Sequence, residues 1–248
     1  MTAAKLEAAL ARPTPAIVAY LTAWFPDEAR FFAAFDALEQ SADAIEIGVP
    51  FSDPMADGPV IQRASHVALA AGATLDRLLT RLEQRAPERP RILMSYLNPL
   101  LALPEDVLAP RLARAGISAL VVPDLPYEES GALAAALAAE EIALAPMVTP
   151  LTHPDRLAAM TAAARGFVYA VTRTGTTGAG IADPAAVARS LARVRAASRA
   201  PVLAGFGVRA RSDVAALCPP ADGVVVGTAI VEAIERGEDL AAWIARLR

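Results

Sequence analysis

Short apolar runs alternate along this chain with longer Ala-, Leu- and Arg-rich stretches whose apolar residues recur at helical spacing. The apolar runs are bounded by Gly, Pro or Asp, which is typical of strands buried on both faces in a parallel sheet. The strands are expected at 16–21, 44–49, 91–96, 119–122, 143–148, 166–172, 201–204 and 223–226. A helical stretch fills each interval, so the pattern indicates repeated β-α units.

Eight β-α units in 248 residues, without a Gly- and Ser-rich linker, favour a (β/α)8 TIM barrel over a doubly wound α/β sheet. We expect a single barrel domain spanning residues 1–248, with a short extra helix at the N-terminus. In such barrels the active-site residues lie on the loops that follow the strands. The C-terminal strand ends are therefore the places to search for chemistry.

Composition and charge narrow the class of protein. A net charge of −4 gives no electrostatic reason to bind nucleic acid or an anionic membrane. No apolar run reaches membrane-spanning length, and residues 1–16 lack the apolar core of a signal peptide. Cys218 is the lone cysteine, which excludes an internal disulfide. These features predict a cytoplasmic enzyme.

The segment from Ile45 to Pro59 joins a strand to a loop crowded with Pro, Gly and acids. Because strand side chains alternate, Glu46 faces the opposite way from Ile45 and Ile47. A charge inside a parallel sheet is costly unless it is paired or can change its protonation state. Glu46 is therefore a candidate acid or base, and a structural ion pair inside the barrel is an equal alternative.

Asp57 follows in the loop after this strand, from which it can reach the same barrel mouth. Two carboxylates in differently polar settings can have different pKa values and take different proton-transfer roles. The alternative for Asp57 is a turn residue that bonds its own backbone before Gly58, with Pro59 starting a helix.

Glycine-rich segments follow three of the late strands. Gly205-Phe206-Gly207 and Gly227-Thr228 stand where barrels commonly bind phosphate through backbone N–H groups and a helix N-terminus. The sequence thus predicts a phosphate pocket that needs no basic side chain, with plain tight turns as the alternative. The run of Gly175, Gly178 and Gly180 is compatible with a closing lid or an ordinary loop.

Residues that are absent or isolated limit the chemistry further. Lys5 is the only lysine and precedes the first strand, so no lysine is placed for a Schiff base inside the barrel. His66 and His153 cannot make a three-histidine zinc site, and no Ser-His-Asp or P-loop pattern is present. Proton transfer on a phosphorylated small molecule, without metal or cofactor, remains.

The segment IEIGVPFSDPMADG at 45–58 resembles, without a gap, the signature of the tryptophan synthase α subunit family. The resemblance continues at 94–99, 122–130, 172–179, 205–207 and 227–230, so it covers nearly the whole chain. One departure is Trp24-Phe25-Pro26, where the family usually has Gly-Asp-Pro. The resemblance therefore does not predict the shape of the loop after the first strand.

This resemblance implies a lyase of tryptophan biosynthesis that cleaves indole-3-glycerol phosphate, by a retro-aldol step, into indole and glyceraldehyde 3-phosphate. It also implies a partner β subunit that receives the indole within an αββα complex. No cofactor is expected in this chain, because pyridoxal phosphate would belong to the β subunit. A stand-alone indole-3-glycerol phosphate lyase and a non-catalytic activator of the β subunit are the alternatives.

The resemblance also implies roles for individual residues. Glu46 would protonate the indole carbon and manage the glycerol hydroxyl proton, while Asp57 would hold the indole N–H. Positions around the substrate fall on Tyr20, Tyr96, Val121, Val148, Tyr169 and Phe206, with Thr177 as the lid residue that bonds the loop aspartate. Phosphate-binding positions fall on Gly178, Gly207, Gly227 and Thr228. The partner surface is expected at Pro50, Phe51 and Asp53.

Overall fold

Residues 2–172, 183–205 and 207–248 are described by a computed structural model, and their strands form one parallel sheet. The strands are β1 (Ala16–Thr22), β2 (Ala44–Gly48), β3 (Arg91–Met94), β4 (Ile117–Val121), β5 (Ala143–Leu144), β6 (Met147–Val148), β7 (Val168–Val171), β8 (Val202–Gly205) and β9 (Gly223–Val226). Their order in the sheet is β5-β4-β3-β2-β1-β9-β8-β7-β6. Every strand expected from the sequence is present within a few residues, which confirms the β-α reading of the pattern.

The two ends of this sheet are neighbouring segments of the chain. β5 pairs with β4 and β6 pairs with β7, with only Ala145 and Pro146 between them. The Ala145 N–H donates to the Leu120 carbonyl on one side (2.9 Å), and the Pro146 carbonyl accepts from the Tyr169 N–H on the other (3.0 Å). The single strand expected at 143–148 therefore changes partner at a proline, which has no N–H to donate, and the sheet curls into a barrel.

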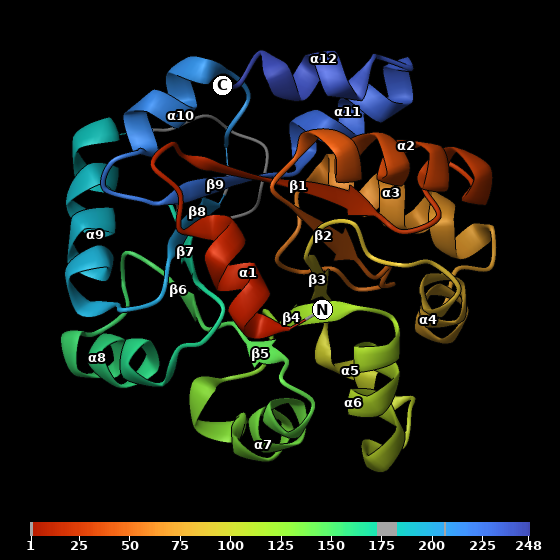
Figure 1. Cartoon of the computed structure of the whole chain (residues 1–248), viewed down its shortest axis with the longest axis horizontal. Coiled ribbons are helices and arrows are strands. Elements are labelled where there is room, and N and C mark those ends of the chain that lie inside the picture. Colours follow the sequence, from red (N-terminus) through yellow and green to blue (C-terminus); the bar gives the residue numbers. More distant parts are fainter. Residues whose placement is uncertain (1, 173–182, 206) are drawn as a thin grey trace.

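Helices surround the strands, as Figure 1 shows. They are α1 (Ala3–Leu10), α2 (Glu28–Ser41), α3 (Pro59–Ala70), α4 (Leu75–Glu83), α5 (Leu97–Leu101), α6 (Glu105–Arg114), α7 (Gly131–Ala139), α8 (Pro154–Ala163), α9 (Pro184–Ala197), α10 (Arg211–Leu217), α11 (Thr228–Arg236) and α12 (Leu240–Ala245), with a 3-10 turn η1 (Tyr127–Glu129). Asp27, Thr74 and Asp183 begin α2, α4 and α9 with side-chain caps on backbone N–H groups. Among the described helices, none is both long and apolar enough to cross a membrane.

The first helix, α1, covers one end of the barrel. It packs on β2 and β4 and lies across the ring of strands in Figure 1. Its Leu6 and Leu10 are fully buried, and its Glu7 carboxylate accepts the backbone N–H of Gly166 (2.7 Å). The short extra N-terminal helix is thus confirmed. A site is therefore expected at the opposite end of the barrel, where the strands have their carboxyl ends.

A buried ion pair ties the helices to the sheet at the closed end. Arg91 of β3 is completely buried and pairs with Glu39 of α2 (3.2 Å). Its guanidinium also donates to the carbonyls of Arg85 and Ala115 (3.1 and 3.0 Å). Burial raises the pKa of Glu39 and lowers the pKa of Arg91, but the charges face each other. A structural buried charge in this barrel is thus compensated by an opposite charge and by hydrogen bonds to backbone carbonyls.

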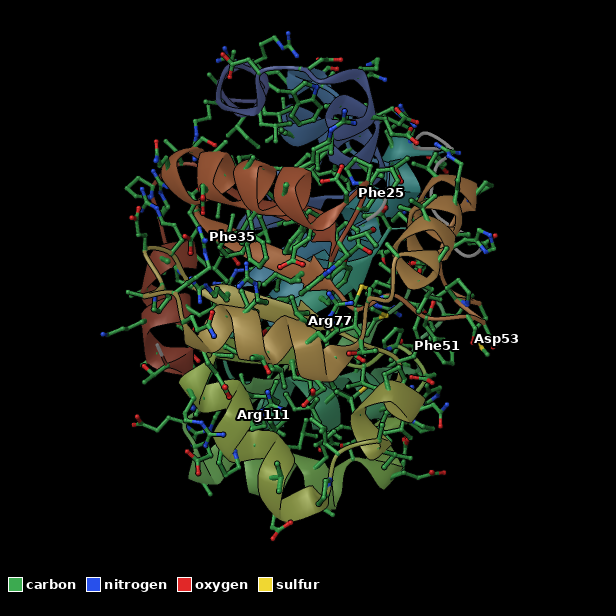
Figure 2. The ribbon with its side chains drawn as sticks, turned by 90° about the vertical axis from the view of Figure 1, so that its right-hand side faces the viewer. Phe25, Phe35, Phe51, Asp53, Arg77 and Arg111 are labelled. Carbon is green, nitrogen blue, oxygen red and sulfur yellow. The ribbon has the colours of Figure 1, made fainter. Side chains whose placement is uncertain are left out.

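The loop after β1 packs against the helices α2 and α4. Trp24 has a positive φ of 63° and is buried against Phe31 of α2, with ring centroids 5.9 Å apart. The Arg77 guanidinium of α4 lies 5.4 Å from the centroid of the Trp24 ring. Figure 2 shows Phe25, Phe35 and Arg77 on this side of the molecule. The aromatic loop therefore joins β1 to α2 and α4.

Candidate active site

Two neighbouring strands place an acid and a tyrosine inside the barrel. Tyr20 of β1 and Glu46 of β2 are register partners, and both are buried. The Tyr20 ring leans over Gly48, where a Cβ would lie only 2.1 Å from the Tyr20 hydroxyl oxygen. Tyr169 of β7 leans over Gly205 in the same way, with a Cβ there 2.2 Å from its ring. The missing side chains of these glycines make room for two phenols in the barrel interior.

Glu46 has no compensating partner in the described part of the chain. It is 0% exposed, and within the described residues no hydrogen-bond donor or cation reaches either carboxylate oxygen. Burial, and next the negative charge of Asp57, raise the pKa of Glu46 to about 8. The ion pair considered for this residue is thus absent from the described part of the chain, in contrast to Glu39 with Arg91. A carboxyl group with this pKa is largely protonated at neutral pH.

Asp57 lies in a more polar setting. It is 5% exposed, and its carboxylate accepts a hydrogen bond from the Tyr96 hydroxyl (3.2 Å). Burial raises the pKa of Asp57 to about 6, although the bond from Tyr96 lowers it. Asp57 is therefore largely ionised at neutral pH while Glu46 is not. The turn alternative does not describe this carboxylate, whose partner among the described residues is a side chain from another loop.

Tyr96 contacts three residues of the loop that follows β2, namely Phe51, Ala56 and Asp57. Its hydroxyl also accepts the N–H of Ala56 (2.9 Å), and its ring stacks on Phe51 with centroids 5.0 Å apart. Phe51 is half-buried and Asp53 is exposed, and Figure 2 shows both at the edge of the molecule. Pro50 is buried in the chain alone, so Phe51 and Asp53 are the two expected interface residues that offer surface.

We expect Tyr96→Phe to raise the pKa of Asp57 above 6, because the bond that favours its ionised form is lost. A hydrogen bond to a charged group contributes about 1.5–3 kcal/mol, so the pKa of Asp57 is expected to rise by about one to two pH units. Carbon-13 NMR of the Asp57 carboxyl group measures it. Tyr127→Phe is the matched control, since its hydroxyl bonds the Ala159 carbonyl instead. An unchanged Asp57 titration in Tyr96→Phe would contradict the assignment.

A narrow cavity of about 40 Å³ connects the two acids with the expected phosphate end. Its walls include both acids and both buried tyrosines, and they continue to the turn before α11. The expected residues in these walls are Tyr20, Glu46, Asp57, Tyr169, Gly207, Gly227 and Thr228. Gly207 has a φ of +90°, which favours glycine. The first turn of α11 has N–H groups without helical partners, which suit an anion.

The other expected substrate and phosphate residues either do not line this cavity or fall outside the described residues. Val121 and Val148 are fully buried at the ends of β4 and β6. Thr177, Gly178 and Phe206 fall outside the described residues, as does the glycine run around them. The cavity also contains Arg209, which the sequence reasoning missed. Its position two residues after Gly207 was the available signal.

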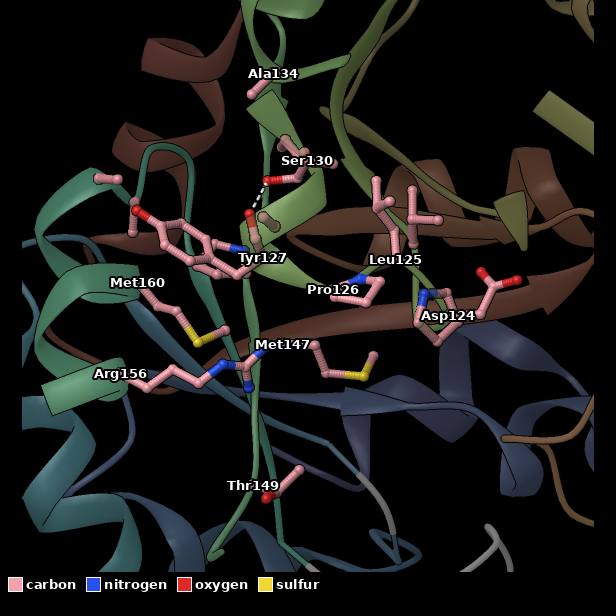
Figure 3. A pocket seen from close by; sticks show the side chains of 17 residues that line it. Asp124, Leu125, Pro126, Tyr127, Ser130, Ala134, Met147, Thr149, Arg156 and Met160 are labelled. Atoms are coloured by element: carbon pink, nitrogen blue, oxygen red, sulfur yellow. Dashed lines mark hydrogen bonds between the residues drawn. The ribbon is translucent and has the colours of Figure 1, made fainter. Parts of the chain in front are cut away.

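A larger hollow of about 380 Å³ lies between the loop after β4 and α8. Figure 3 shows Met147 and Met160 in it, with Arg156, which pairs with Glu128 (2.7 Å). Neither Glu46 nor Asp57 lines this hollow, so it is separate from the acids. Among the residues that the structure describes, no group of three or more His, Cys, Asp or Glu is arranged to hold a metal.

A family profile and individual relatives both match this chain over nearly its whole length. The profile of the family described as "Tryptophan synthase alpha chain" matches residues 6–247. A tryptophan synthase alpha chain from Desulfovibrio desulfuricans is 42% identical over 247 residues, covering 98% of this chain and 97% of that protein. One from Solidesulfovibrio magneticus is 42% identical over 243 residues, with coverages of 97% and 95%.

Solved structures have the same architecture. A Mycobacterium tuberculosis tryptophan synthase structure superposes with a TM-score of 0.88 at 37% identity, covering 98% of this chain and 95% of that one. The tryptophan synthase subunit alpha of Campylobacter jejuni gives a TM-score of 0.85 at 30% identity, with coverages of 96% and 97%. The fold of this chain is therefore similar to theirs over nearly its whole length.

Proposed function

Because the chain belongs to the tryptophan synthase alpha chain family, we propose that Glu46 and Asp57 carry the α reaction of that family in this barrel. The reaction cleaves indole-3-glycerol phosphate into indole and glyceraldehyde 3-phosphate and makes the protein a carbon-carbon lyase. One observation supports these roles above all. Glu46 is fully buried without a partner among the described residues, in one cavity with Asp57 and the glycines of the phosphate end.

The different pKa values of the two acids assign them different roles. At neutral pH Glu46 holds its proton and Asp57 carries a negative charge. Glu46 is therefore the general acid that protonates C3 of the indole ring. That protonation places positive charge on the indole nitrogen, and the Asp57 carboxylate stabilises it by accepting the N–H.

Glu46 regains a proton when the carbon-carbon bond breaks. The ionised Glu46 carboxylate takes the proton from the glycerol hydroxyl next to the ring, and the carbon-carbon bond to C3 breaks as the aldehyde forms. The electron pair of that bond restores the aromatic indole, and Glu46 ends protonated as it began. The reaction is thus redox-neutral, and each proton has a stated donor and acceptor.

The phosphate of the substrate would bind at Gly207, Gly227 and Thr228, where backbone N–H groups and the start of α11 favour an anion. Tyr20 and Tyr169 line the same cavity as Glu46 and these phosphate-end residues. Burial and the charges of the acids raise the pKa of both phenols, so they stay protonated. Because the free space of about 40 Å³ is smaller than the substrate, the site must widen for binding.

A β chain is the partner that we propose for this protein. The family name alpha chain implies such a partner, and the stacked Phe51 and exposed Asp53 form part of the contact surface. We further propose an αββα complex in the cytoplasm, with pyridoxal phosphate in the β chain and none in this one. Residues 1–248 would act as one domain, with the strands described along the chain joining one sheet.

Indole release measured on the purified chain, alone and with a β chain, tests this function. We expect slow cleavage by the isolated chain and a large stimulation by the β chain. Equal rates with and without the partner would support a stand-alone lyase. Undetectable cleavage in the presence of an active β chain would contradict catalysis by this chain and favour a non-catalytic activator.

A further inference from the structure

An arginine lines the phosphate end of the cavity. Arg209 lies in the loop between β8 and α10 and lines the same cavity as Gly207, Gly227 and Thr228. Its backbone is fixed, because the Arg209 N–H donates to the Asp213 carboxylate of α10 (2.8 Å). The side chain is 44% exposed, so its guanidinium is open to solvent.

A carboxylate on the phosphate-binding helix holds this side chain. Two guanidinium nitrogens of Arg209 donate to the two carboxylate oxygens of Glu232 (2.8 and 3.2 Å). Glu232 lies on α11, one turn after Thr228. An unpaired carboxylate at this place would repel a phosphate at the start of the helix, since like charges there oppose the favourable dipole. Arg209 neutralises that carboxylate, and the Arg236 guanidinium also lies 4.0 Å from it, so the start of α11 is not left beside an uncompensated negative charge.

We propose that Arg209 is a phosphate-binding residue, held by Glu232, that supplies the cationic side chain of a pocket otherwise built from backbone amides. The inference rests on the proposed function, which places the substrate phosphate at Gly207, Gly227 and Thr228. An arginine at this place favours a dianionic phosphate tail over a neutral hydroxyl or a carboxylate. Arg209 therefore contributes to specificity for phosphorylated substrates.

A second arginine pair offers a matched control. Arg63 of α3 makes an equally close bidentate pair with Glu235, also on α11, and is similarly exposed (51%). Arg63 does not line the cavity. Replacing either arginine removes one charge and one ion pair to the same helix. Only the loss of Arg209 should weaken phosphate binding.

The test is calorimetric titration of the full chain with glycerol 3-phosphate and with inorganic phosphate. We expect Arg209→Gln to weaken binding about tenfold, the size of a lost charge-assisted hydrogen bond at a half-exposed site. Arg63→Gln should change it less than about twofold. The KM of Arg209→Gln should rise with kcat nearly unchanged, and added salt should weaken its phosphate binding less than that of the wild-type chain.

Arg209→Lys, which keeps the charge, should retain most of the affinity. Equal affinities of Arg209→Gln and Arg63→Gln would overturn the proposal while leaving the proposed reaction intact. The proposal would also be overturned if the Lys and Gln variants both lost affinity and both had a lowered Tm. In that case the ion pair of Arg209 with Glu232 would only hold the loop in place. A wild-type chain that binds neither compound would remove the phosphate site itself, and the role of Arg209 with it.

Discussion

Glu46→Gln is expected to abolish indole release while leaving substrate binding nearly intact. The glutamine keeps the size of the side chain but has no proton to give to the ring and no base for the hydroxyl. A positioned general acid or base contributes about 10²- to 10⁴-fold to the rate. Single-turnover cleavage with a β chain present measures the loss, and calorimetric titration measures binding. Wild-type turnover by this variant would end the assignment.

The same variant should become more stable relative to the wild-type chain as pH rises. The pKa of Glu46 is about 8 in the fold and about 4.3 in an unfolded chain, so the native state holds a proton that the unfolded state releases. Stability from this group is fully present below about pH 4.3 and is lost as pH rises towards 8. Glutamine never ionises and does not suffer this loss.

Between pH 5 and 7.5 the stability difference should shift in favour of Glu46→Gln by about 3 kcal/mol. Denaturant unfolding at both pH values measures it, and comparing pH values cancels the cost of burying the amide. Glu39→Gln is the control: Glu39 is also buried with a raised pKa, but this substitution breaks the pair with Arg91 and should destabilise the chain. A pH-independent difference for Glu46→Gln would mean that Glu46 ionises normally.

Strand positions were predictable because burial on both faces leaves an unmistakable run of apolar residues. The split of the strand expected at 143–148 could not be predicted, because it depends on which neighbouring strand each half pairs with in the barrel. Alternation along the strand indicated that Glu46 faces inward. That no described residue pairs with it could not be derived, because a sequence does not show which distant arginines approach.

The polar connections of the site were the least predictable part. The bond from Tyr96 to Asp57 joins two loops that are adjacent only in the folded barrel. Arg209 was missed because backbone amides alone explain phosphate binding at a helix start, so its position two residues after Gly207 did not single it out. Trp24 was recognised as a departure from the family, but its packing on Phe31 required the position of α2.

Asp57→Asn is expected to slow cleavage about 10²- to 10³-fold, the usual effect of removing a group that stabilises developing charge. An amide of the same shape offers no negative charge to the positive indole nitrogen. The wild-type pH profile of kcat/KM should be bell-shaped with limbs near pH 6 and 8, which belong to the coupled pair of Asp57 and Glu46. The variant should lose the limb near pH 6, since no carboxylate remains to ionise there.

The basic limb of this variant should also move. The negative charge of Asp57 raises the pKa of Glu46, so its removal lowers that pKa, and the activity that remains should fall at a lower pH than in the wild-type chain. Asp53→Asn, compared in the isolated chain so that the proposed β contact does not enter, is the control, because this exposed aspartate belongs to the same loop but does not line the cavity. Its pH profile should match that of the wild-type chain. If Asp57→Asn kept an acidic limb near pH 6, a different group would carry that ionisation and Asp57 would leave the mechanism.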